Sequence, residues 1–304
     1  MTVSTRTVAT LGPSPVRVGQ RRTRAAYRGR LRSCRTTGVP MRIVSVNAWG
    51  GALSDRLLDW LPACGADVLC LQEVTRTPGL AGWTRFSDGE RTLPQRAGLL
   101  DDVRGVLPRH QPIFVASDSG PVHDDAGTRH RQDFGVATFV AERLPVCGVE
   151  SAFVHGGFTD HDEWAIADRP RVALAVHTVD RAGGRSVWVV QVHGLRDPAG
   201  KGDTPARRRQ ALRLAELVRR IRGPQDLVVL CGDLNLLPGS ETFGILAEAG
   251  LTDLVGNADT RTSHYGKPVR HASYLLVSDV AAVKEFTVLT APEVSDHRAL
   301  LLEI

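Results

Sequence analysis

No apolar run in the sequence approaches the ~18 residues that a transmembrane helix needs. Aromatic side chains make up only 5% of the 304 residues, although a hydrophobic fraction of 42% is enough for a substantial core. None of the five cysteines forms a Cys-x-x-Cys or Cys-x-x-His pair, so the usual zinc-binding spacings are missing. Cys70 and Cys231 lie inside apolar runs. We interpret them as buried, reduced thiols of a cytoplasmic protein.

Acidic residues are absent from the first forty positions, which contain nine Arg and no Lys. The net charge of +5 therefore belongs to this segment, because residues 41–304 hold 29 basic and 33 acidic side chains. The body of the chain gives little support for broad binding of polyanions. Three interpretations of residues 1–40 are open: a disordered basic tail, a targeting peptide, or a mis-assigned start ahead of Met41.

Residues 41–304 alternate strand-like and helix-like segments, without a linker, a repeat or a low-complexity stretch. Helices are predicted from Ser54 to about 63, near 95–107, over 205–221 and after Ser240. Residues 75–132 give the weakest pattern. Strands are predicted over 42–46, 67–71, 135–140, 171–179, 186–192, 226–231, 274–277, 283–288 and 298–303. We therefore predict one α/β domain over residues 41–304.

Polar side chains cluster beside the predicted strands, at the ends where each strand meets a loop. Sheet enzymes place reactive groups at such ends, because the scaffold is rigid there and the loops are exposed. Each residue alone has a structural explanation, such as an Asx turn or a satisfied histidine, but their combination favours a site. The residues are Asn47, Gln72, Glu73, His193, Asp233, Asn235, Asp296 and His297.

These residue types suit the hydrolysis of a phosphoester. Glu73 and Asp296 offer the carboxylate oxygens that Mg²⁺ or Mn²⁺ prefers. A carboxylate such as Asp233 can orient and deprotonate the attacking water. Asn235 and the two histidines can stabilise the charge that develops on the phosphoryl oxygens. The sequence therefore predicts a divalent-metal site with a water-activating acid beside it.

The same residues lie within motifs that resemble the endonuclease/exonuclease/phosphatase superfamily. The matching stretches are SVNAWGG, DVLCLQEV, VVQVHGL, LCGDLNLLPGS and SDHRALLLEI, and the resemblance extends over residues 42–304. It implies an α/β fold, a four-layer sandwich with two central mixed β-sheets flanked by helices. It also implies that Glu73 binds the metal with Asn47 and Asp296 beside it. Asp233 and His297 would act on the water and the phosphorane, and Asn235 and His193 would contact the phosphate.

One stretch departs from the pattern of this superfamily, which usually has an Arg-x-Asp-Tyr sequence before the final motif. Here the residues are His271, Ala272, Ser273 and Tyr274, so a serine stands in place of the acid that orients the catalytic histidine. A hydroxyl cannot match the charge-assisted bond of a carboxylate, which is roughly twice as strong. We therefore predict a less basic His297, with Ser273, His271 and Gln72 as accessory residues.

Two function classes follow from these observations. The first is a monomeric, metal-dependent phosphoesterase that hydrolyses a phosphodiester, either a nucleic acid or a small-molecule or lipid phosphodiester. The second is a catalytically impaired binding protein on the same fold, because of Ser273. The arginine triplet at 207–209 lies on the predicted long helix and is interpreted as part of a solvated helix face.

Overall fold

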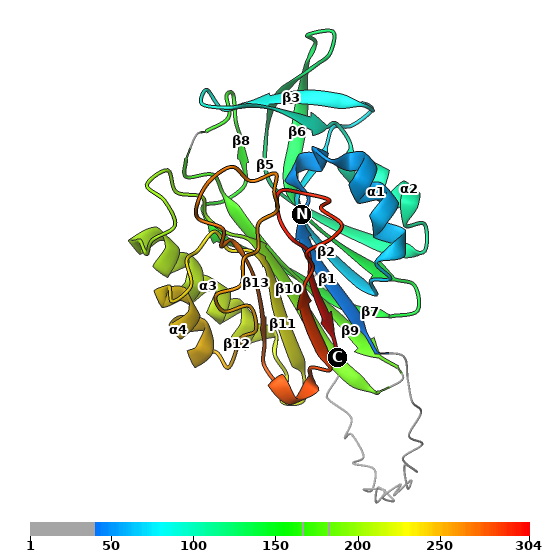
Figure 1. The fold of residues 1–304 in the computed structure, drawn as a ribbon, viewed down its shortest axis with the longest axis vertical. Coiled ribbons are helices and arrows are strands. Elements are labelled where there is room, and N and C mark those ends of the chain that lie inside the picture. The colour runs from blue at the N-terminus through cyan, green and yellow to red at the C-terminus, as the bar shows by residue number, and fades with distance from the viewer. Residues whose placement is uncertain (1–39, 166, 182) are drawn as a thin grey trace, which may run out of the picture. The chain divides into compact units, whose positions relative to one another are not determined.

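Residues 40–165, 167–181 and 183–304 are described here, from a computed structural model of the chain. The three interpretations of residues 1–40 concern a segment that lies, apart from Pro40, outside the described residues. Figure 1 shows two β-sheets packed face to face, with α-helices on both outer sides. None of the described helices combines the length and the hydropathy that crossing a membrane requires.

The first sheet has nine strands in the order β14-β15-β1-β2-β6-β5-β3-β4, with β8 beside β5. Its only parallel pairs among the described residues are β1 with β2 and β5 with β8, so the sheet is mixed. The strands are β1 (Arg42–Asn47), β2 (Val68–Arg76), β3 (Trp83–Ser87), β4 (Thr92–Arg96), β5 (His110–Asp124), β6 (Arg129–Ala141), β8 (Thr159–Asp160), β14 (Glu285–Val288) and β15 (Leu300–Glu303).

The second sheet has six strands in the order β12-β13-β11-β10-β9-β7, and it is mixed as well. The two strands β10 and β11 run parallel, and β9 and β13 flank them in the antiparallel direction. The strands are β7 (Val146–His155), β9 (Arg171–Asp180), β10 (Arg185–His193), β11 (Leu227–Asp233), β12 (Thr252–Asp253) and β13 (Ser273–Val277).

Four α-helices cover the outer faces of the two sheets in the described part of the chain. Helices α1 (Ser54–Ala63) and α2 (Leu99–Val106) pack against the first sheet. Helices α3 (Pro205–Ile221) and α4 (Glu241–Glu248) pack against the second. Short 3-10 helices lie at η1 (Trp49–Gly51) and η2 (Val280–Ala282). The predicted four-layer arrangement is therefore confirmed.

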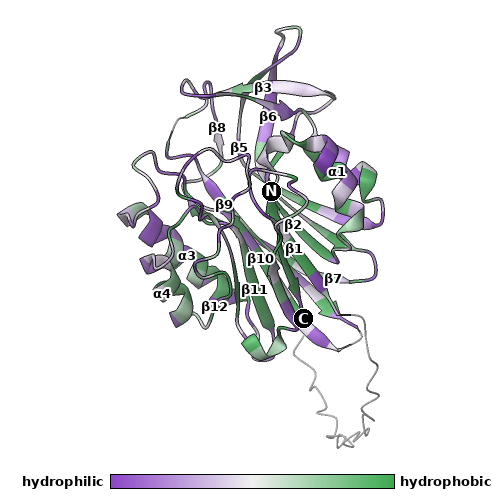
Figure 2. Ribbon diagram, in the orientation of Figure 1, coloured by the Kyte–Doolittle hydropathy of each residue, from purple (hydrophilic) through white to green (hydrophobic). Residues whose placement is uncertain are grey.

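The hydrophobic core fills the space between the sheets. Ile43 and Val68 of the first sheet and Val189 and Leu230 of the second are all fully buried in one cluster. The green strands at the centre of Figure 2 mark the same apolar layer. Full burial of one such side chain stabilises the fold by about 1.5–3 kcal/mol. This rigid double layer fixes the strand ends that carry the polar residues.

The sequence did not predict every element. Strand β7 was not predicted, because most of its side chains are exposed or half-buried and it lacks the continuous apolar run of a central strand. The interpretation of Arg207 as part of a solvated helix face is wrong. Arg207 is only 1% exposed, and its guanidinium donates to the backbone carbonyls of Gly200 and Leu195, which ties α3 to the loop before it.

Candidate active site

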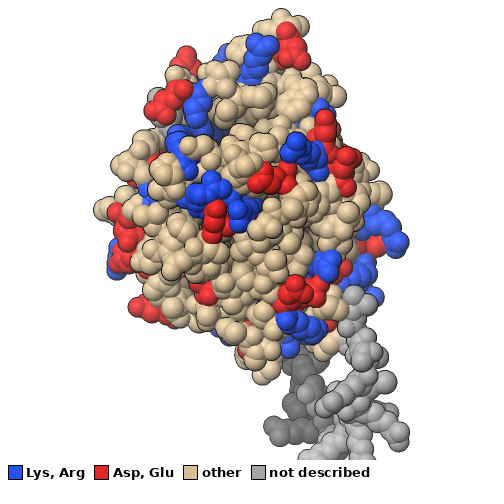
Figure 3. Space-filling model, in the orientation of Figure 1, with Lys and Arg blue, Asp and Glu red and all other residues tan. Residues whose placement is uncertain are grey.

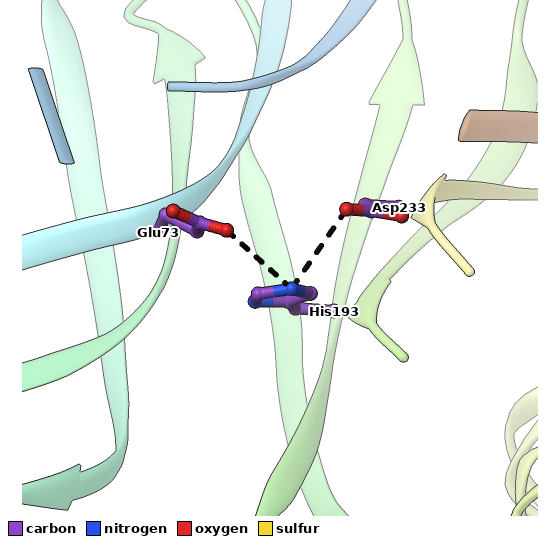
Figure 4. A group of neighbouring side chains, drawn as sticks. All are labelled: Glu73, His193 and Asp233. Carbon is purple, nitrogen blue, oxygen red and sulfur yellow. Dashed lines mark ion pairs between the residues drawn. The ribbon is translucent and has the colours of Figure 1, made fainter. Parts of the chain in front are cut away.

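Two parallel strand pairs, one in each sheet, bring the predicted residues to a common edge. In the first sheet Asn47 lies opposite Gln72, and in the second His193 lies opposite Asp233. Parallel strands end at the same edge, so loops from both sheets meet there. Figure 4 shows the side chains of Glu73, His193 and Asp233 converging on one point.

A β-bulge directs Glu73 into the site. The register of β2 against β6 shifts between Gln72 and Val74, and Glu73 has a φ of 56°. Bulges and positive φ values of this kind redirect side chains at functional sites, at a cost that the surrounding structure must offset. Gln72 instead lies fully buried between the sheets, where its Nε2 donates to Gln191 Oε1 at 2.9 Å. This hydrogen bond joins β2 of the first sheet to β10 of the second.

The amide of Asn47 bridges the two central carboxylates. Its Nδ2 donates to Glu73 Oε1 at 3.0 Å and to Asp233 Oδ2 at 3.1 Å, and its Oδ1 accepts from the backbone N–H of Trp49. The other oxygen of Asp233 accepts from the backbone N–H of Asn235 at 3.0 Å, which closes an Asx turn. Both carboxylates are therefore held in fixed orientations.

Two buried histidines lie on either side of Asp233. The Nε2 of His193 is 3.8 Å from Asp233 Oδ2 and 3.7 Å from Glu73 Oε1. The Nε2 of His297 is 3.3 Å from Asp233 Oδ2, and its Nδ1 is 2.9 Å from the hydroxyl of Ser273. Ser273 thus occupies the orienting position that the sequence predicted for it.

Both imidazoles are neutral at neutral pH. Burial lowers the pKa of His297 well below its ordinary range, and the nearby cations Arg261 and Lys201 lower it further. Burial likewise lowers the pKa of His193, with Arg171 as the next cause. The predicted low basicity of His297 therefore has burial as its largest cause, ahead of any effect of the serine.

Asp296 completes a group of three neighbouring acids. Its Oδ2 accepts from Arg261 Nη1 at 2.5 Å. Even so, the pKa of Asp296 is raised to about 7, chiefly by burial and also by the negative charges of Glu73 and Asp233, while Arg261 acts in the opposite direction. Burial outweighs the arginine here. A group of this kind favours the binding of a cation.

The donor set fits a hard divalent metal. Glu73, Asp233 and His193 each offer one ligand atom, and these atoms lie within 4.8 Å of one another. Carboxylate oxygens are the ligands that Mg²⁺ and Mn²⁺ prefer, and Asp296 lies in the same cavity. The group differs from the predicted metal set because Asp233 and His193 join Glu73, whereas the oxygen of Asn47 accepts a backbone hydrogen bond.

The structure brings most of the predicted residues to one cavity of about 500 Å³. Four predicted residues do not line it: Asn47, Gln72, Ser273 and His271. The ring of His271 faces the carbonyl of Ala258. Asn47 and Ser273 hold the lining residues in place through the hydrogen bonds described above. The predicted residues that line the cavity are Glu73, His193, Asp233, Asn235, Asp296 and His297.

Several basic residues of the cavity were not predicted from the sequence. Arg171 Nη1 is 3.4 Å from His193 Nδ1. Lys201 donates to the carbonyl of His271, and burial lowers its pKa to about 8. Arg169 is held by Asp118 and stacks against Phe134, with its guanidinium 4.5 Å from the ring. Together with Arg261, these residues give the cavity a basic lining.

Apolar and aromatic side chains form a further part of the cavity wall, several of them from the β3–β4 hairpin and the loop at 265–269. Figure 3 shows charged side chains of both signs gathered across the middle of this face. A concave site that combines apolar walls with converging polar groups is typical of sites for small ligands. The apolar and aromatic lining residues include Trp49, Phe86, Leu93, Phe134, Tyr265 and Val269.

Comparison with known proteins agrees with this geometry. The model of the "Endonuclease/Exonuclease/phosphatase family" matches residues 44–297. No curated protein matches the chain. A solved mannosyl-6-phosphatase from Bacteroides thetaiotaomicron is similar in fold, with a TM-score of 0.60 and 16% identity. The similarity covers 86% of this chain and 98% of that one.

Two further solved structures have the same fold. The human Nocturnin catalytic domain with bound sulfate has a TM-score of 0.58 and 17% identity, over 87% of this chain and 93% of that one. The D. rerio TDP2 complexed with single strand DNA product has a TM-score of 0.57 and 12% identity, over 88% and 99%. At these identities the likeness establishes the fold alone.

Proposed function

The chain belongs to the endonuclease/exonuclease/phosphatase family, and we propose that it is a divalent-metal-dependent phosphoesterase that hydrolyses a phosphodiester. One observation supports this most strongly. The carboxylates of Glu73 and Asp233 are bridged by the amide of Asn47 and lie between two neutral histidines in a basic cavity. Metal-assisted attack of water on a phosphoryl group uses carboxylates to hold the metal and positioned donors to stabilise the developing charge, and this site supplies both.

In this proposal Glu73 is the principal metal ligand and Asp296 supports it. The bound Mg²⁺ or Mn²⁺ supplies Lewis-acid stabilisation of the phosphoryl oxygens. The oxygens of Glu73 are positioned by the bulge in β2 and by Asn47. Arg261, which donates to Asp296, keeps that carboxylate turned toward the cavity.

Asp233 has the role of general base toward the attacking water. Its two oxygens are fixed by the Asn47 amide and the Asn235 backbone N–H, so the carboxylate cannot rotate away. A base held within hydrogen-bond reach of the water contributes 10²–10⁴-fold, as an order of magnitude. The proton of the water would pass to Asp233 as the new P–O bond forms. The P–O bond to the leaving oxygen would break, and that oxygen would take up a proton from solvent.

Donors around Asp233 would stabilise the charge on the phosphoryl oxygens. His193 and His297 present their Nε2 atoms to the same side as the carboxylates, and Asn235 and Lys201 line the cavity beside them. Because these donors are already in place, little reorganisation accompanies the reaction. The presence of Ser273 in place of an orienting acid leaves this set of donors assembled.

The cavity favours a small-molecule or lipid-headgroup phosphodiester over a DNA duplex. Its volume of about 500 Å³ lies within the roughly 300–1,000 Å³ that is typical of small-ligand sites. The solved structures of similar fold include a mannosyl-6-phosphatase, Nocturnin with bound sulfate and TDP2 with a single strand DNA product. The first of these names states phosphatase activity, and we extend phosphoester chemistry to this chain as part of the proposal.

The test uses the full chain with Mg²⁺ or Mn²⁺, and with EDTA as the metal-free control. The substrates are a bis-aryl phosphodiester, plasmid DNA, an abasic duplex and single-stranded DNA. Glu73→Gln and Asp233→Asn are each expected to lower turnover on the order of 10²-fold or more, because each removes one charged group from the reacting centre. Asp59→Asn, on the exposed face of α1, is the matched control and should keep the wild-type rate.

The outcomes separate the two function classes. Metal-dependent turnover by the wild type supports the enzyme if Glu73→Gln and Asp233→Asn both lose it. The best substrate then identifies the class of enzyme. Wild-type rates in both variants would contradict the assignment of the site. If the folded protein hydrolyses none of the four substrates with either metal, the binding-protein alternative is favoured instead.

A further inference from the structure

Arg171 is a buried cation without a carboxylate partner. It is the first residue of β9, is 5% exposed and lines the cavity. No carboxylate of the described residues forms an ion pair with it, and its Nε has no hydrogen-bond partner. Its neighbour Arg169, by contrast, forms two hydrogen bonds with Asp118. A buried charge that lacks a carboxylate in direct contact is costly, and only the longer-range attraction of Asp118, Glu73 and Asp233 offsets that cost.

Among the described residues, His193 is the one side chain that Arg171 contacts through a hydrogen bond. Arg171 Nη1 lies 3.4 Å from His193 Nδ1. A guanidinium has only N–H donors and no acceptor, so the Nδ1 atom must accept this bond. A histidine that accepts at Nδ1 is neutral and carries its proton on Nε2. The contact therefore selects one tautomer of the ring.

The surroundings of the second ring nitrogen agree with this tautomer. The Nε2 of His193 faces Glu73 Oε1 at 3.7 Å and Asp233 Oδ2 at 3.8 Å. Ionised carboxylates only accept hydrogen bonds, so a proton on Nε2 is favoured there. With Nδ1 occupied by Arg171 and Nε2 protonated, the ring has no lone pair to offer a metal ion.

We propose that Arg171 is a positioning residue that locks His193 as its Nε2–H tautomer, which makes His193 a donor to the substrate phosphoryl group and excludes it as a metal ligand. This inference rests on the proposed function for the identity of the ligand, although the state of the ring can be measured without it. It assigns the metal to the carboxylates alone, even though His193 lies within ligand distance of them.

The other histidine of the site shows why an arginine is needed for this role. His297 Nδ1 contacts the hydroxyl of Ser273, which can donate or accept. Such a partner permits either tautomer, and the choice depends on the groups around Nε2. Arg171 permits only one tautomer. The two rings therefore differ in how firmly their Nε2 protons are fixed, although both face Asp233.

The test reads the ring directly by NMR. The full chain is labelled with ¹⁵N-histidine, and long-range ¹H–¹⁵N spectra distinguish protonated from unprotonated ring nitrogens. The His193→Gln variant identifies the signals of His193. In the wild type we expect Nε2 protonated and Nδ1 unprotonated, both before and after addition of Mg²⁺. In Arg171→Met we expect a form with protonated Nδ1 to appear beside the Nε2–H form, because the donor that excludes a proton from Nδ1 is gone while the carboxylates still favour a proton on Nε2.

Arg42→Met is the matched control, since it removes a half-buried arginine that pairs with Glu303, and the His193 signals should not change. A protonated Nδ1 in the wild type, or a wild-type pattern in Arg171→Met, would overturn the proposal. A wild-type spectrum with protonated Nδ1 would overturn the proposal even if Arg171→Met does not fold. The spectra require no substrate. A failure to hydrolyse any substrate would therefore contradict the proposed function and leave the test of the His193 tautomer unaffected.

Turnover gives a second measurement if a substrate is found. Losing one fixed donor at a reacting centre costs on the order of 10²-fold in kcat. Arg171→Met is therefore expected to lower kcat by about that factor and to show the altered tautomer in the same sample. A lowered kcat with unchanged His193 signals would contradict a positioning role.

Discussion

Replacing Ser273 by aspartate tests how the chain uses a hydroxyl in place of a carboxylate. Ser273 is 3% exposed, and its Oγ lies 2.9 Å from His297 Nδ1. The new carboxylate can only accept from Nδ1, so it would require a proton there. Since Asp233 faces the Nε2 atom at 3.3 Å, the variant would hold His297 between two acceptors and favour its protonated form.

The magnitude follows from the two kinds of hydrogen bond. A neutral bond contributes about 0.5–1.5 kcal/mol and a bond to a charged group about 1.5–3 kcal/mol. The difference of roughly 1–1.5 kcal/mol corresponds to about one pKa unit, at 1.36 kcal/mol per unit. Ser273→Asp should therefore raise the pKa of His297 by about one unit or more from its low starting point.

The assay is a pH titration of the His297 ring by NMR, together with the pH dependence of kcat/KM. The wild-type ring should stay neutral well below pH 6.5, because burial, Arg261 and Lys201 all lower its pKa. In Ser273→Asp the titration should shift upward, and any change in the acidic limb of the rate profile should shift with it. A gain in activity would mean that the serine limits the wild-type enzyme.

An unchanged His297 titration in a folded Ser273→Asp protein would refute the reasoning. Ser273→Ala gives the opposite perturbation, since Nδ1 then loses its partner, and up to about tenfold lower turnover is expected from one neutral hydrogen bond. Ser278→Ala controls for stability. That serine accepts from Val228 N just beyond the other end of β13, far from His297, so its loss should leave the titration unchanged.

Two other predictions follow from the charged groups. Burial lowers the pKa of Lys201 to about 8, so kcat/KM should fall as the pH rises through about 8. Lys201→Arg should remove this fall, because a guanidinium stays charged at that pH. The same fall in the variant would show that Lys201 is not the group that titrates. Burial alone would raise the pKa of Asp118, but the charge and hydrogen bonds of Arg169 and the hydrogen bond of Ser117 outweigh burial and hold this pKa below 3.8. The ion pair of Asp118 with Arg169 therefore stabilises the fold above pH 3.8. Its contribution is lost as the pH falls through the lower pKa of the folded state. Asp118→Asn should cost about 3–5 kcal/mol at pH 7, and urea unfolding that shows under 1 kcal/mol would contradict this.

The central strands could be predicted from the sequence because they are buried on both faces. Strands β1 and β11 have almost no exposed side chain, and such strands appear as continuous apolar runs. The edge strand β7 and the hairpin of β3 and β4 could not be predicted, since they mix exposed and buried positions without a regular pattern. Their pairing partners determine their conformation more than their own composition does.

The acidic and histidine residues of the site could also be predicted, because each follows or precedes a recognisable strand. The basic residues could not. Arg261 lies within an irregular loop, and only the folding of that loop brings it to Asp296, 35 positions away. Arg171 begins a strand and Lys201 follows another by several residues, so neither has a local pattern that separates it from a surface cation.

The basic residues change how the site should be understood electrostatically. Both histidines are neutral, since burial and nearby cations lower their pKa values. The positive charge that faces a phosphoryl group therefore comes from Arg171 and, below a pH of about 8, from Lys201. Neither forms an ion pair with a carboxylate in the described part of the chain. The imidazoles then act through fixed N–H dipoles, a role that needs no charged partner. A serine beside His297 is compatible with such a site, because the acid it replaces is needed only where the ring must become charged.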